Sequence, residues 1–117
     1  MTELDLALEK YLQDETQQVQ YYQTIVMTEF LVPLVDGDGG EEQVTPLIME
    51  TDGKPYLMLF DSEERVSSWA KSPVKYMRMT GSGLAKISTE GLHWAINIGG
   101  MHAKEFIPAE IEHLKTL

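Results

Sequence analysis

The chain has 117 residues, with nineteen acidic against nine basic residues and a formal net charge of −10. A surface of that sign repels phosphate backbones and anionic lipid heads, so it argues against nucleic-acid and membrane binding. It favours a basic protein partner or a cation, and the alternative is that the charge serves solubility alone. Cysteine is absent, which excludes disulfides and thiolate metal sites. The length fits a single domain, residues 1–117, with enough buried surface for a core without cross-links.

The beginning of the chain is acidic and lacks the basic-then-apolar order of a signal peptide. Apolar runs stay far below the length of a membrane span. We therefore expect a cytoplasmic protein.

Two helices are predicted at the start of the chain. Residues 3–13 carry leucine and tyrosine at the spacing of an amphipathic helix, and a second helix is predicted over 15–27. Residues 30–35 favour a strand, in which Pro33 indicates an edge position or a bulge.

An acidic, glycine-rich turn follows at residues 36–42. Asp36 and Asp38 have the spacing of a calcium-binding loop, but Glu41 stands where that loop needs a glycine and Leu47 where it needs a bidentate carboxylate. We expect a solvated acidic loop that holds no metal.

The middle of the chain carries the clearest structural pattern. Strands are predicted over 43–50 and 55–60, joined as antiparallel neighbours by a hairpin turn at Asp52 and Gly53. The second of these strands has no polar residue between positions 56 and 60, which is typical of a central strand covered on both faces.

A helix is predicted directly after this strand. Asp61 or Ser62 can cap its first turn, and Asp61 with Glu64 has the spacing of a capping box. Trp69 then falls on the side of the helix that faces the strand, so we expect Phe60 and Trp69 both to be buried, with Trp69 packed against the central strand.

The C-terminal half alternates the same element types. Gly81–Gly83 is expected to connect a strand to a short helix, and Pro108 suits the start of the last helix. The fold class is therefore α+β, a mainly antiparallel five-stranded sheet with helices packed against it. Its predicted strands lie near 30–35, 43–50, 55–60, 74–79 and 92–98.

The hairpin, strand and helix of the middle region resemble the N-terminal domain of the SseB family, the bacterial enhanced serine sensitivity proteins. The matching residues are Asp52, Gly53, Tyr56, Phe60, Ser62 and Trp69, with an earlier Val-Pro step at Val32 and Pro33. Asn97 stands where the family has an Asn-Pro-Gly turn, but Ile98 replaces the proline. The resemblance covers roughly residues 15–115, and it implies a small α+β domain whose motifs are structural rather than catalytic.

No residue pattern in the sequence is typical of a catalytic or cofactor site. His93, His102 and His113 lack the spacing of metal ligands. Gly81-Ser82-Gly83 lacks the frame of a nucleophile elbow or a phosphate-binding loop. We therefore expect a protein that is not an enzyme and that uses no cofactor.

The strongest candidate for a binding surface is the end of the last predicted strand. Asn97 is a polar exception there, and Gly99 and Gly100 leave the backbone open to a ligand. His93 is expected on the same strand face as Asn97, and His102 lies just beyond the glycines. The structural alternative is that Asn97 only caps the turn.

Two functional hypotheses remain open, with an enzyme as a weaker third. The first is an interaction domain that docks a basic protein partner, as an immunity or inhibitor protein does, with charge complementarity speeding association. The second is a small-ligand-binding domain that uses the turn from Asn97 to His102. The third, a hydrolase with catalytic carboxylates, finds no supporting constellation in the sequence.

Overall fold

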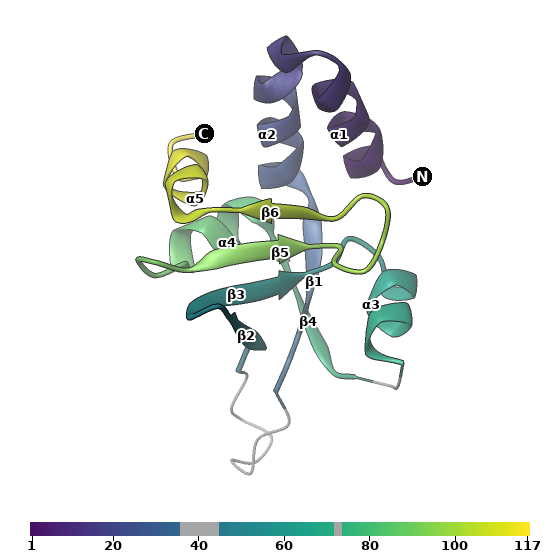
Figure 1. The fold of residues 1–117 in the computed structure, drawn as a ribbon, viewed down its shortest axis with the longest axis vertical. Coiled ribbons are helices and arrows are strands. Elements are labelled where there is room, and N and C mark those ends of the chain that lie inside the picture. Colours follow the sequence, from purple (N-terminus) through teal and green to yellow (C-terminus); the bar gives the residue numbers. More distant parts are fainter. Residues whose placement is uncertain (36–44, 72–73) are drawn as a thin grey trace.

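The computed structural model describes residues 1–35, 45–71 and 74–117 (Figure 1). None of the helices in these described ranges is both long and apolar enough to cross a membrane. The helices are α1 (Glu3–Gln13), the 3-10 helix η1 (Glu15–Gln17), α2 (Gln18–Met27), α3 (Glu63–Ala70), α4 (Gly81–Ile87) and α5 (Pro108–Leu114). The strands are β1 (Glu29–Pro33), β2 (Ile48–Thr51), β3 (Lys54–Leu59), β4 (Tyr76–Thr80), β5 (His93–Ile96) and β6 (Lys104–Phe106).

The α+β class is confirmed, but the prediction of one five-stranded sheet is wrong. The described strands form a two-stranded sheet, β1-β4, and a four-stranded sheet in the order β2-β3-β5-β6. β3 and β5 run parallel, whereas the other pairs are antiparallel. The chain between β3 and β5 holds α3, β4 and α4, and such a crossover permits parallel pairing. β6 was not predicted because three residues are too short to show an alternating pattern.

Several boundaries differ from the predicted ones for local reasons. Gly81–Gly83 is not a connection but the first turn of α4, because the Thr80 side chain accepts a hydrogen bond from the Gly83 N–H at 3.2 Å and caps the helix. The strand predicted over 92–98 ends at Ile96, since Asn97 has a positive φ of 53°. The strand predicted over 43–50 is described only from Ile48 onward as a regular strand.

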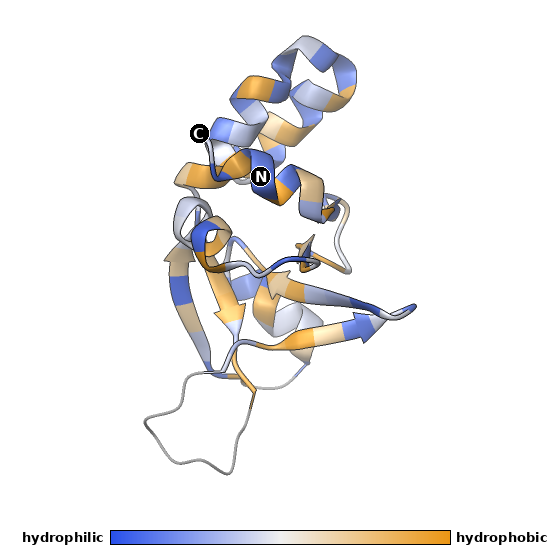
Figure 2. Cartoon of the chain, turned by 90° about the vertical axis from the view of Figure 1, so that its left-hand side faces the viewer, coloured by the Kyte–Doolittle hydropathy of each residue, from blue (hydrophilic) through white to orange (hydrophobic). Residues whose placement is uncertain are grey.

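The prediction that residues 55–60 form a central strand is confirmed. β3 lies between β2 and β5 in the four-stranded sheet. Leu57 and Leu59 point into the main core, while Met58 and Phe60 join a second buried cluster on the opposite face. Figure 2 shows the hydrophobic colouring of the strands below the helical hairpin of α1 and α2.

The two cores receive different helices. The main core gathers buried residues of α1, α2, α4 and α5 against one face of the sheets, with Tyr21, Ile25, Trp94 and Phe106 at its centre. The second core lies under α3. There Phe60 is fully buried as predicted, but Trp69 is only half-buried because it stands in the last turn of α3, at the rim of a pocket. Their ring centroids lie 5.2 Å apart.

The acidic turn at residues 36–42 lies outside the described residues, so the prediction about calcium stays a prediction. Within the described part of the chain, no group of three or more histidine, aspartate or glutamate side chains has a geometry that suits a metal ion.

Candidate functional site

Asn97 forms a tight turn where β5 ends. Its N–H donates to the carbonyl of Leu59 at 2.8 Å, and its carbonyl accepts from the Gly100 N–H at 3.2 Å. Its side-chain Oδ1 accepts from the N–H of Asp61 at 3.1 Å. Asparagine tolerates the left-handed backbone conformation better than most residues. Asn97 therefore joins the ends of the parallel strands β3 and β5. It has the structural role in the turn that the sequence analysis gave as the alternative to binding.

The amide nitrogen of the Asn97 side chain takes no part in this turn. Asn97 is 3% exposed, and its Nδ2 has no hydrogen-bond partner among the described residues. The bond from Asp61 fixes Oδ1, so the unpaired atom is the amide nitrogen and carries two donor hydrogens. A buried donor without a partner costs about 1–3 kcal/mol, so most such groups are satisfied in folded proteins.

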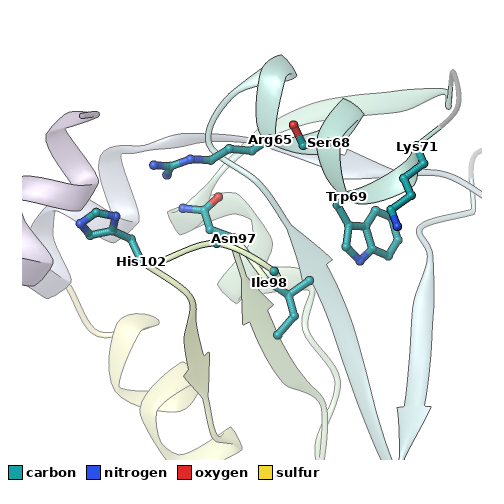
Figure 3. A pocket seen from close by; sticks show the side chains of 9 residues that line it. Arg65, Ser68, Trp69, Lys71, Asn97, Ile98 and His102 are labelled. Atoms are coloured by element: carbon teal, nitrogen blue, oxygen red, sulfur yellow. The ribbon is translucent and has the colours of Figure 1, made fainter.

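Asn97 is one of the residues that line a pocket of about 300 Å³ between α3 and the turn after β5. In Figure 3 the nitrogen end of Asn97 points toward the side where the Arg65 guanidinium and the His102 ring lie. Trp69 and Lys71 border the opposite side (Figure 3). The lining residues are Arg65, Ser68, Trp69, Lys71, Asn97, Ile98, Gly99, Gly100 and His102.

α3 supplies the wall opposite the turn. Ser62, not Asp61, caps this helix, because its hydroxyl accepts from the Arg65 N–H at 3.2 Å. Lys71 ends the helix in a left-handed conformation, with φ 60°, a position that usually holds glycine. Lys71 also lines the pocket, and its ammonium forms no ion pair with any residue that the structure describes.

The Asp61 side chain does not cap α3 but accepts hydrogen bonds from Arg65 and Thr2. Its Oδ1 accepts from Arg65 Nη1 at 2.8 Å and its Oδ2 accepts from the Thr2 hydroxyl at 2.6 Å. Arg65 also donates to both carboxylate oxygens of Asp5, at 2.8 and 2.5 Å. The sequence analysis missed this network. Its only available signal was the i, i+4 spacing of Asp61 and Arg65.

Asp5 is the buried member of this network. Burial raises the pKa of its carboxyl, but hydrogen bonds from Arg65 and the Thr2 N–H and the positive charge of Arg65 outweigh it and lower the pKa to about 2. The carboxylate is therefore ionised at neutral pH, and it anchors Arg65 in the pocket wall.

His102 enters the pocket wall from the segment between β5 and β6. Its Nε2 lies 2.7 Å from Glu9 Oε2, and its Nδ1 lies 3.8 Å from Asp5 Oδ2. Through Asp5 and Glu9, α1 thus positions two of the pocket-lining side chains, Arg65 and His102. No residue of α1 lines the pocket itself.

Four of the five predicted site residues line this pocket: Asn97, Gly99, Gly100 and His102. His93 does not. It stands at the start of β5 beside Tyr56, with ring centroids 5.0 Å apart. Because the strand ends before Asn97, its alternation does not bring these two side chains together.

A second hollow of about 530 Å³ adjoins the pocket and was not anticipated. It lies on the face of the four-stranded sheet that carries Met58 and Ala95. Trp69 and Ile98 line both the pocket and this hollow, so the two adjoin at these residues. We call the second hollow the sheet groove.

Comparison with known proteins gives a family. Searches of curated proteins and of solved structures returned no significant match. The family model of the SseB protein N-terminal domain matches residues 4–113, which is nearly the whole chain. The resemblance carried by the Asp-Gly turn, the central strand and the capped helix is therefore confirmed, and the chain belongs to the SseB N-terminal domain family.

Proposed function

We propose that this chain is a non-catalytic binding domain that holds an acceptor oxygen of a protein partner in the pocket at the Asn97 turn. The observation that carries the proposal is the buried Nδ2 of Asn97, which has no hydrogen-bond partner among the described residues and belongs to a residue that lines the pocket. A carbonyl or carboxylate oxygen placed there would satisfy it and recover the free energy lost by leaving it unpaired.

The neighbouring groups favour the same kind of ligand. The pocket is bordered by the donors of Arg65, Ser68 and Lys71 and by the ring of His102. Gly99 and Gly100 add no side chain at the rim, so a partner's main chain can approach closely.

A binding role is supported over catalysis by how the nearby acids and bases are used. The two carboxylates beside the pocket, Asp5 and Asp61, both accept hydrogen bonds from Arg65. A general acid or base needs a side chain that can exchange its proton with the ligand, and these side chains already have partners.

The partner's expected basic character rests on the net charge of −10, which acts over the whole surface. The pocket presents local donors instead. A partner that is basic overall and inserts one carbonyl or carboxylate satisfies both conditions.

The same pocket supports a second candidate, a small ligand bound alone. A volume of about 300 Å³ lies at the lower end of the roughly 300–1,000 Å³ usual for small-molecule sites. The two candidate functions differ in what the ligand must contain. A small ligand needs only the acceptor group, whereas a protein partner makes further contacts outside the pocket.

The test begins with two defined probes, N-methylacetamide for a peptide carbonyl and acetate for a carboxylate. Each is titrated into isotope-labelled protein, and the side-chain amide signal of Asn97 is followed by NMR. We expect a saturable shift with at least one probe, and the comparison identifies the preferred oxygen. A signal unmoved by both would contradict the proposal.

Peptides selected from a phage-displayed random dodecapeptide library then test the partner function. Asn97→Asp keeps an oxygen for the Asp61 N–H but replaces the donor by a second acceptor. We expect it to weaken peptide binding by at least about tenfold, or roughly 1.4 kcal/mol. His93→Ala, outside the pocket, is the matched control and should change affinity less than about twofold.

Melting temperatures of both variants establish that they remain folded. Peptide affinity that is equal for the wild type and a folded Asn97→Asp variant would overturn the role of this amide. Probe shifts without any selectable peptide would favour the small ligand over the protein partner.

A further inference from the structure

The sheet groove adjoins the pocket and lies on the face of the four-stranded sheet that carries Met58 and Ala95. Its floor contains Met58 and Ala95, which are 4% and 7% exposed, from the central strands β3 and β5. Met49 on β2 and Ile98 after β5 stand higher and are 43% and 42% exposed. A face of this kind offers apolar contact area to a partner.

Charge is distributed unevenly along the groove. Asp52 at the β2–β3 turn and Glu105 on β6 both line it. Neither carboxylate forms an ion pair within the described part of the chain. The Glu105 carboxylate accepts a hydrogen bond from the Tyr56 hydroxyl at 2.9 Å.

Lys104 also lines the groove, but its ammonium does not pair with the carboxylates of Asp52 and Glu105. Its ammonium donates to the main-chain carbonyl of Glu105 at 2.8 Å and lies 5.0 Å from the ring centroid of Phe106. Phe106 belongs to the main core on the other face of the sheet. The positive charge of Lys104 is therefore directed away from the two carboxylates.

We infer that the sheet groove takes an extended partner segment with apolar side chains and a lysine or arginine, whose cation lies at Asp52 and Glu105. This inference rests on the proposed function, because the same segment places its acceptor oxygen in the Asn97 pocket. The pocket and the groove share Trp69 and Ile98 in their linings, so one segment can reach both contacts. Charge complementarity selects this occupant over an acidic or purely apolar segment.

The experiment uses the peptides selected from the random dodecapeptide library on the wild-type chain. We expect them to contain apolar residues with a nearby Lys or Arg. Replacing that basic residue of the peptide by Glu should weaken binding to the wild type at least about tenfold. Glu105→Lys should weaken the original peptide similarly and restore binding of the Glu-containing peptide.

Glu15→Lys is the matched control, because it makes the same change in net charge. Glu15 lies in η1, at the tip of the α1–α2 hairpin and away from the sheet groove (Figure 1). We expect it to alter peptide affinity less than about twofold. Glu105→Gln separates loss of the carboxylate from introduction of a cation and should give an intermediate loss.

The results distinguish the two proposals. Selected peptides without a basic preference, or equal losses from Glu105→Lys and Glu15→Lys, would overturn the groove inference, while sensitivity to Asn97→Asp would still support the pocket. A specific charge swap at Glu105 with no effect of Asn97→Asp would support the groove and overturn the pocket. A selection that yields no binding peptide would overturn both.

Discussion

The guanidinium of Arg65 donates hydrogen bonds from both terminal nitrogens to the carboxylate of Asp5, although the two residues are 60 positions apart. The Asp5 side chain is 0% exposed and that of Arg65 is 29% exposed. The contact joins α1 to α3 and thereby fixes one wall of the Asn97 pocket. Bidentate pairs of this kind are geometrically specific as well as strong.

Removing the cation of this pair should be costly. We expect Arg65→Met to lower the free energy of unfolding by about 3 kcal/mol, because it leaves the buried Asp5 carboxylate without its partner. Urea denaturation measures the loss. The double variant Asp5→Asn with Arg65→Met should be more stable than Arg65→Met alone. Equal stability of the wild type and Arg65→Met would contradict this account of the pair.

The Asp5 carboxyl should also make stability depend on acid pH. Its pKa is about 2 in the folded chain against an ordinary 3.8, so the unfolded chain binds this proton more readily. Its contribution is fully present above about pH 4 and is lost as the pH falls toward 2, a change of about 2 kcal/mol. Unfolding experiments between pH 2 and 5 should show a shallower slope for Asp5→Asn than for the wild type. Glu15→Gln, at an exposed position, should retain the wild-type slope.

The two aromatic residues under α3 should differ in their contribution to stability. Phe60 is 0% exposed, whereas Trp69 is half-buried at the pocket rim. We expect Phe60→Ala to cost about 3–5 kcal/mol and Trp69→Ala about 1–3 kcal/mol. Chemical denaturation of both variants gives the order. A larger loss from Trp69→Ala would show that the packing under α3 is assigned wrongly.

Gly81 should be intolerant of a side chain. A Cβ at this position would lie 2.0 Å from the main-chain oxygen of Ile25, where α4 crosses α2. Since backbone cannot move aside as a side chain does, Gly81→Ala should cost about 3 kcal/mol or more. Ser82→Ala, one residue further along α4, should change stability by about 0.5 kcal/mol or less. Similar melting temperatures for the two variants would contradict the close approach.

Sequence patterns found the elements whose signals are local. The helix over 3–13, the hairpin at Asp52 and Gly53, and the central strand ending near Phe60 follow from apolar spacing and turn chemistry. The turn at Asn97 was also visible, since asparagine before two glycines is unusual at the end of an apolar strand. The same pattern misplaced His93, because it could not show where β5 ends.

Sequence by itself determined the acidic charge, the α+β class and the position of the turn at Asn97, because each depends on composition or on neighbouring residues. Only the tertiary structure decided that β4 leaves the larger sheet to pair with β1, so that β5 lies parallel to β3. Only it brought Asp5 to Arg65 and left the buried Nδ2 of Asn97 without a partner among the residues that the structure describes. These are contacts between distant segments, and their partners are chosen by the packing of the whole chain rather than by any local pattern.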